Sequence, residues 1–378
     1  YSMVQVRYTV GGDNGPPDPE LADYVAKWNA TYASPRIVIA TASDMFSEFE
    51  RRHGALVPEV RGDFTGYWED GAASTAKETA MARTGAGRLV QAEALWSILG
   101  RPRFPEEKDE EAWRQVVLFS EHTWGASDSV SNPDGEGPRA QWEYKKAFAE
   151  RAEKMSHELL AEAAGGTEGQ AVERGRQAID VVNTCSWERT DLVTVPVALS
   201  AIGDLVEDET GAAVPSQRLR TGELAFVAGH VPGFGAKRYF VGAGRPDTMK
   251  PGRADGNEVR NRTMRAVVDG ASGAVRSLVW TGAGTGRELV DTAKFPGLGH
   301  YLYVPGVDPG KAVTVSAAGL RIVERGPVLS SIVLQSDAPG TKGLLREYRF
   351  VEGVDRLDIA VTLDKEKVRE KESVHIAF

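Results

Sequence analysis

The sequence of 378 residues has one cysteine, Cys185. A single cysteine cannot form a disulfide within the chain, and a zinc site built only from cysteines of this chain is also excluded. Any metal ion would therefore be bound by histidine, aspartate or glutamate. No apolar run reaches the ~18 residues that cross a bilayer, and glycine and polar residues interrupt the first thirty positions, where a signal peptide needs an apolar stretch. These absences indicate a cytoplasmic protein.

Basic residues are in the minority. The chain has 45 lysines and arginines against 54 aspartates and glutamates, so its net charge is -9. No positive field attracts it to phosphate backbones or anionic lipids, and we expect neither nucleic acid nor membrane as a partner. Hydrophobic residues make up 41% and charged residues 26%, as in an ordinary globular protein of two or three domains. The sequence is compatible with a homo-oligomer.

Several catalytic motifs are missing. The chain has no G-x-S-x-G turn, no P-loop, no H-x-D pair and no H-E-x-x-H helix, so a metal site made wholly within this sequence is poorly supported. Of the six histidines, His157 lies off the apolar face of its predicted helix, and His230 and His300 have no carboxylate partner in view. His122 differs, because it lies in a loop directly after a predicted helix.

Residues 1–55 alternate between strand-like and helical patterns. We predict strands over 3–10 and 36–41, and helices over 19–32 and 43–53. Ser43 is the expected N-cap of the second helix, and Gly54 is its expected stop. The alternation is typical of an α/β layer, although two such units cannot close a sheet alone.

Residues 56–164 have helical periodicity. Three helices are predicted, over 72–99, 109–120 and 138–163. Each has an apolar stripe, as expected of helices in an antiparallel bundle. The residues of these stripes are Leu89, Ala92, Leu95, Trp96 and Leu99, then Trp113, Val116, Val117 and Ser120, and finally Tyr144, Phe148, Ala152, Met155 and Leu159.

After residue 178 the pattern changes to short strands separated by turns. Residues 264–268 and 274–280 predict a hairpin, and Glu352-Gly353 predicts the turn of another. Residues 357–363 alternate apolar and polar side chains, which places one face of that strand on a core. About two hundred residues of this kind predict a β-sandwich or a pair of stacked sheets.

Two loops are candidates for chemistry. His122 follows the second helix of the bundle, where it is either a metal ligand or simply a helix cap. Asp63, Tyr67 and Trp68 lie in a loop that precedes a helix, and aromatic rings beside carboxylates suit the binding of a sugar. The alternative is that the two aromatic side chains are buried against the bundle.

These residues resemble the α-mannosidases of glycoside hydrolase family 38. The resemblance is carried by Gly62-Asp63-Phe64 followed by Tyr67-Trp68, by Ala92-Glu93 within a long helix, and by the histidine loop after Leu118-Phe119. Residues 182–189 are similar to the family's V-x-N-x-x-S-W-x-R segment, and residues 263–278 with 288–290 are similar to its hairpin and following strand. The resemblance extends from about residue 8 to residue 378.

The resemblance implies a zinc ion bound by a His-x-Asp pair, by the aspartate nucleophile and by a histidine that matches His122. The family often has His-His-Asp where this chain has Glu121-His122-Thr123. The pair and the nucleophile would then lie upstream of Tyr1. Asp13 falls near the family's acid/base carboxylate, although Asn14 could equally take that position. Trp68 matches an aromatic residue that contacts the sugar, and Asp63 and Tyr67 share its motif.

The expected fold is therefore a multidomain α/β + α + β protein. Residues 1–55 would form the end of an α/β barrel-like catalytic domain, residues 56–164 a three-helix middle domain, and residues 178–378 a β-sandwich domain that is incomplete at its C-terminal end. The expected function is that of part of a retaining, zinc-dependent α-mannosidase acting on α-mannosides. The alternative is a carbohydrate-binding or scaffold protein that keeps this fold without catalysis.

Overall fold

The computed structural model describes residues 2–6, 8, 10–11, 15–61, 74–121, 128–129, 131–165, 172–173, 175–246, 254–282, 284, 286–315 and 319–378. The chain forms a mixed helical and β structure with many antiparallel strands. It divides into two compact units, Tyr1–Asp70 and Gly71–Phe378. None of the helices in the described residues is both long enough and apolar enough to cross a membrane.

The first unit contains the helices α1 (Leu21–Thr31) and α2 (Ala42–His53) and the short 3-10 helix η1 (Gly54–Leu56). Thr41, rather than Ser43, caps α2. The hydroxyl of Thr41 accepts from the backbone N–H of Asp44 at 3.2 Å, and the Asp44 carboxylate accepts from the backbone N–H of Thr41 at 3.2 Å. This reciprocal capping box satisfies two free donors of the first turn. The backbone of Gly54 has a right-handed helical conformation, so the chain continues into η1 and does not stop at the predicted position.

The two strands expected in the first unit are absent from the described residues of 3–10 and 36–41. A strand needs a neighbour for its backbone N–H and C=O groups, and a hydrophobic layer for its side chains. The β-branched side chains have no such cover here: Val4 is 84% exposed and Val38 is 70% exposed. A β-branched run is therefore insufficient, because the described part of this unit offers it no partner strand.

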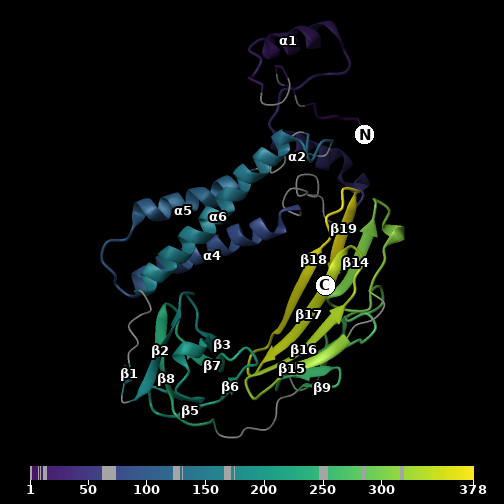
Figure 1. Cartoon of the computed structure of the whole chain (residues 1–378). Helices are drawn as coiled ribbons and strands as arrows, with labels where there is room; N and C mark the ends of the chain where they lie inside the picture. The colour runs from purple at the N-terminus through teal and green to yellow at the C-terminus, as the bar shows by residue number, and fades with distance from the viewer. Residues whose placement is uncertain are drawn as a thin grey trace. The chain divides into compact units, whose positions relative to one another are not determined.

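Helices α4 (Ala76–Ile98), α5 (Glu106–Phe119) and α6 (Glu136–Ala164) of the second unit lie side by side (Figure 1). All three contribute to one apolar cluster, which contains Leu89, Ala92, Leu95, Trp96, Ala112, Leu159 and Ala163. Gly85 allows α4 and α6 to approach closely, since a Cβ at this position would lie 3.3 Å from the backbone oxygen of Ala152. α6 ends at Gly165, whose φ of 88° is left-handed.

The three predicted helices are confirmed among the described residues, with ends that differ by a few positions. Four residues assigned to the stripes are exposed instead: Leu99, Val117, Ser120 and Tyr144. Leu99 is the C-cap of α4, beyond its last helical residue. On α5 the buried positions are Ala112, Gln115 and Phe119, and a residue at 117 lies off the face that this spacing defines.

The β region begins with two antiparallel sheets, in the orders β1-β2-β8-β4-β5 and β3-β7-β6. The strands are β1 (Val172–Glu173), β2 (Arg176–Asn183), β3 (Arg189–Val195), β4 (Leu205–Asp208), β5 (Ala213–Val214), β6 (Ser216–Arg218), β7 (Leu224–Val231) and β8 (Gly235–Gly242). Side chains from both sheets share a core around Phe226 and Tyr239, whose ring centroids are 4.8 Å apart.

The remaining strands form three further antiparallel sheets, in the orders β13-β12-β11-β10-β9, β15-β16-β17-β18 and β14-β19. The strands are β9 (Ala254–Asp255), β10 (Glu258–Arg260), β11 (Met264–Val268), β12 (Val275–Trp280), β13 (Arg287–Glu288), β14 (His300–Pro305), β15 (Gly319–Arg325), β16 (Leu329–Ser336), β17 (Thr341–Val351), β18 (Leu357–Lys365) and β19 (Glu372–Ala377). The predicted β11–β12 hairpin and the β17–β18 turn are confirmed.

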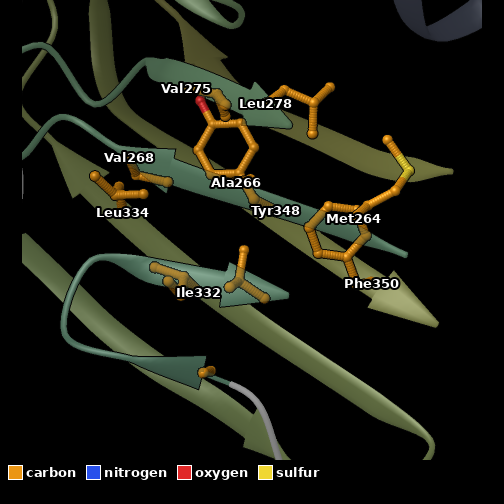
Figure 2. Close-up of a cluster of buried hydrophobic side chains, with 11 residues drawn as sticks. Met264, Ala266, Val268, Val275, Leu278, Ile332, Leu334, Tyr348 and Phe350 are labelled. Carbon is orange, nitrogen blue, oxygen red and sulfur yellow. The ribbon is translucent and has the colours of Figure 1, made fainter. Parts of the chain in front are cut away.

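One core joins the first two of these sheets. Figure 2 shows Tyr348 and Phe350 of β17 among Met264, Val268 and Leu278 of β11 and β12. Burial alternates along the middle of β17, so Tyr348 and Phe350 face this core and Glu347 and Arg349 do not.

The two halves of the β region meet at Gln217 of β6, which is buried. Its side-chain amide donates to Glu324 at 2.9 Å, and its carbonyl oxygen accepts from the backbone N–H groups of Val328 and Leu329 at 3.2 and 2.9 Å. Glu324 also accepts from the backbone N–H of Arg220 at 2.9 Å. A single side chain thus joins β6 to the turn between β15 and β16.

Candidate functional site

All five predicted site residues, Asp13, Asp63, Tyr67, Trp68 and His122, lie outside the residues that the structure describes. Their mutual distances are therefore untested, and their assigned roles stay predictions. The described neighbours of His122 do show how its segment begins.

The residue before His122, Glu121, is held in place by an ion pair. Glu121, directly after α5, forms an ion pair with Lys145 of α6. The Lys145 side chain is largely buried, so this pair ties the end of α5 to the neighbouring helix. Loss of Glu121 would leave the buried Lys145 ammonium without this partner, which is unfavourable. Glu121 therefore has a structural partner of its own, and the chain enters the His122 segment from an anchored end.

The described residues contain no cluster of three or more histidine, cysteine, aspartate or glutamate side chains that could hold a metal ion. A zinc site that uses His122 would need its other ligands from elsewhere. The described part of the chain does not by itself fit a zinc ion.

The segment 182–189 has a clear structural role. The side-chain amide of Asn183 donates to the backbone oxygens of Trp187, Val231 and Pro232 at 2.7, 3.1 and 3.2 Å, and its oxygen accepts from the backbone N–H of Cys185 at 3.0 Å. Asn183 thus clamps the loop after β2 to the end of β7. The Trp187 ring is left mostly exposed. These hydrogen bonds explain why an asparagine stands at this position: it organises the backbone of two loops. The explanation needs no catalytic role.

His230 has a carboxylate partner, contrary to the expectation from sequence. Its Nδ1 lies 2.7 Å from Glu188, a residue 42 positions away in the chain. Both side chains are exposed, and His230 has a left-handed φ of 53°. The pair forms because β3 and β7 are antiparallel neighbours, which linear sequence does not reveal.

A pocket of about 450 Å³ lies in the C-terminal half of the β region. It is lined by Asp269, Ala271, Ser272, Arg276, Thr292, Pro296, His300, Thr314 and Val315. Donation from the backbone N–H and then from the hydroxyl of Ser272 lowers the pKa of Asp269. Burial lowers the pKa of His300, and the charge of Arg346 lowers it further. His300 was not predicted as a site residue, and no sequence motif marks it.

Neither the known family models nor the curated proteins include a match to this sequence. Several solved chains match its fold, including two from Enterococcus faecalis. One is described as a protein in glycosyl hydrolase family 38 from Enterococcus faecalis, with 14% identity, and the other as an α-mannosidase from Enterococcus faecalis V583, with 13% identity. Each match has a TM-score of 0.56 and covers 96% of this chain.

The chain shares their fold. It spans about half of their length, since each match covers 50% of the solved chain. Family 38 is also the family that the sequence motifs resemble. The likeness therefore links this chain to glycoside hydrolases of that fold, while identities of 13% and 14% leave activity and substrate as matters for proposal.

Proposed function

We propose that this chain is the central and C-terminal portion of a retaining, zinc-dependent α-mannosidase-like glycoside hydrolase that acts on α-mannosides. The observation that carries this proposal is the fold match, which extends over 96% of the chain to structures described as a glycosyl hydrolase family 38 protein and as an α-mannosidase. The order of the motifs along the sequence supports the same reading. Residues 1–55 would belong to the catalytic domain, residues 56–164 would form a three-helix middle domain, and residues 178–378 a β-sandwich domain.

Each predicted site residue has a role in this proposal. Asp13 would protonate the leaving oxygen and later take a proton from water, while a second carboxylate forms the covalent intermediate. The rings of Tyr67 and Trp68 would stack on the sugar, and Asp63 would accept hydrogen bonds from its hydroxyls. His122 would bind zinc through one ring nitrogen, and the other ligands would lie outside this chain. Zinc, when bound, would polarise the sugar hydroxyls.

The test compares two histidine variants of a protein that contains this chain together with the proposed remaining ligands. His122→Ala should lose both bound zinc and the hydrolysis of an aryl α-mannoside. His157→Ala is the matched control, because His157 is an exposed residue of α6 whose partner is Glu153 at 3.3 Å. It should keep both properties. A His122→Ala protein with full zinc content would refute the assignment of His122.

The chain of 378 residues alone should show no turnover, because the proposal places the nucleophile elsewhere. Measurable mannosidase activity of this chain would contradict that placement. The alternative function, a carbohydrate-binding or scaffold protein, predicts that the longer protein binds mannosides without cleaving them. Binding and turnover are therefore measured on the same sample.

A further inference from the structure

The pocket around His300 is formed by segments that are distant in sequence. Asp269 and Ser272 belong to the turn between β11 and β12, Arg276 lies on β12, and Thr292 precedes β14. Its volume of about 450 Å³ is within the range of small-molecule sites. Nothing in the proposed mannosidase reaction uses this pocket.

His300 is a buried residue with a ring nitrogen that is unpaired among the described residues. Its exposed fraction is 4%, and its Nδ1 has no hydrogen bond among the described residues. Buried polar atoms in proteins are nearly always paired, and leaving one unpaired costs about 1 to 3 kcal/mol. Burial, and then the charge of Arg346, lower the pKa of His300, which favours the neutral form of the ring. A neutral imidazole has one N–H to donate. Nδ1 has almost no accessible surface, so a ligand in the pocket would pair with the other ring nitrogen, Nε2, which also has no hydrogen bond among the described residues.

Arg346 supplies an unbalanced positive charge behind the pocket. Its exposed fraction is 0%, and no described carboxylate forms an ion pair with it. Its guanidinium donates to the backbone oxygens of Ser272 and Gly299 at 2.8 and 3.1 Å and to the hydroxyl of Ser336 at 3.2 Å, and its Nε has no partner among the described residues. Ser272 lines the pocket, and Gly299 directly precedes His300. A buried cation of this kind is stabilised by a nearby anion.

The charges at the rim do not offset Arg346. Asp269 is the pocket's carboxylate, and one of its oxygens already accepts from the backbone N–H groups of Ala271 and Ser272 at 3.1 and 2.7 Å and from the Ser272 hydroxyl at 2.8 Å. Arg276 is exposed and forms no ion pair with the described residues, although its charge helps to lower the pKa of Asp269. The positive charge of Arg276 and the negative charge of Asp269 cancel each other. The positive charge of Arg346 therefore remains without a counter-charge among these residues.

We propose that this pocket binds a small oxyanion, the phosphate or carboxylate group of a metabolite, with His300, Arg276 and Thr292 as donors. The Thr314 hydroxyl is not among the donors, because it already donates to the backbone oxygen of Tyr301 at 2.7 Å. A guanidinium at the rim gives the charge-assisted hydrogen bonds that favour an oxyanion over a neutral hydroxyl group. The part of the pocket that the anionic group does not fill would hold the rest of the metabolite.

The first test is calorimetric titration of the 378-residue chain with inorganic phosphate, acetate, a hexose phosphate and the corresponding neutral hexose. Phosphate or acetate should bind, and the neutral hexose should bind at least tenfold more weakly than the hexose phosphate. Tighter binding of hexose phosphate than of inorganic phosphate would identify a phosphorylated metabolite as the source, and preference for acetate would identify a carboxylate. Equal binding of hexose and hexose phosphate, or no binding of any anion, overturns the proposal.

Two arginine variants test the location of the site. Arg276→Gln should weaken anion binding about tenfold, the size expected for loss of a charge-assisted hydrogen bond. Arg321→Gln is the matched control, since Arg321 is an exposed strand arginine of β15 and does not line the pocket. It should leave binding unchanged. Both residues are exposed, so both variants should fold. Equal effects of the two substitutions would overturn the assignment.

The second test observes the ring directly by NMR. Phosphate should shift the ring signals of His300, identified by their loss in His300→Gln, while the exposed histidines His157, His230 and His375 serve as internal controls. The mannosidase proposal can fail without affecting this result, because neither experiment measures turnover. A phosphate titration that leaves the His300 signals unmoved overturns the proposal.

Discussion

Gln217 offers the sharpest test of how the two halves of the β region are joined. Replacing it by alanine removes the acceptor of two backbone N–H groups, those of Val328 and Leu329, and the donor to one oxygen of Glu324. Gln217 and Glu324 are 8% and 7% exposed, so little water reaches them in the native protein. Gln217→Ala thus leaves three buried polar atoms without a partner.

The magnitude follows from those three atoms. Each buried group left unpaired costs about 1 to 3 kcal/mol, and water that enters the space of the deleted side chain recovers part of this. We expect Gln217→Ala to lower the free energy of unfolding by about 3 kcal/mol. Gln335→Ala is the matched control, because Gln335 is an exposed residue of β16, and its effect should be within about 0.5 kcal/mol.

Urea denaturation followed by circular dichroism gives the stability change, and hydrogen exchange with mass spectrometry locates it. The peptide that contains Val328 and Leu329 should exchange faster in Gln217→Ala, while peptides from α4 and α6 should not change. A loss below about 1 kcal/mol with unchanged exchange of that peptide would refute the reasoning. A chain with several cores need not unfold in one transition, so the exchange experiment carries more weight than the fitted free energy.

Three further predictions follow from burial, packing and charge. Leu89→Ala should cost about 2 to 5 kcal/mol in chemical denaturation, because Leu89 is 0% exposed, whereas Val90→Ala, at a position that is 56% exposed, should cost about 0.5 kcal/mol or less. Gly87→Ala should stabilise α4 by about 0.5 to 1 kcal/mol in thermal unfolding, since its Cβ meets open space, and Gly85→Ala should be less stable than Gly87→Ala because its Cβ would press on α6. The folded pKa of His300 lies below its unfolded value of about 6.5, so its contribution to stability is complete above that value and is lost as the pH falls through the folded pKa. The urea midpoint of His300→Gln should therefore fall less than that of the wild-type chain between pH 7.5 and 5.5, and equal slopes would contradict this.

The sequence predicts elements whose signal is local. The stripe through Phe148, Ala152 and Leu159 has the period of a helix and ends in a glycine, and α6 forms over that range with Gly165 as its left-handed cap. The β17–β18 hairpin is similarly marked by alternation on both sides of a glycine turn. In these cases the side chains that decide the structure are neighbours in the sequence.

Features that depend on distant partners were predicted less well. The strands expected over 3–10 and 36–41 are missing from the described residues of those ranges, because β-branched side chains do not supply a neighbouring strand. The partner of His230 was missed because Glu188 reaches it only across the β3–β7 pair. His300 and Arg346 are close only in the folded chain, so no spacing in the sequence marks their pocket. The predicted residues of the mannosidase site stay predictions.

The clamp at Asn183 limits how this protein can vary. One side chain fixes the separation of two loops through four backbone groups, and a Cβ at Gly233 would already lie 2.4 Å from the oxygen of Ser186. An insertion in either loop would break several of these bonds together, so neither loop can lengthen without the other adjusting. Peptide tags or grafted binding loops should therefore be tolerated poorly here and better at the open turn around Gly211, where a Cβ would meet no atom within 4 Å.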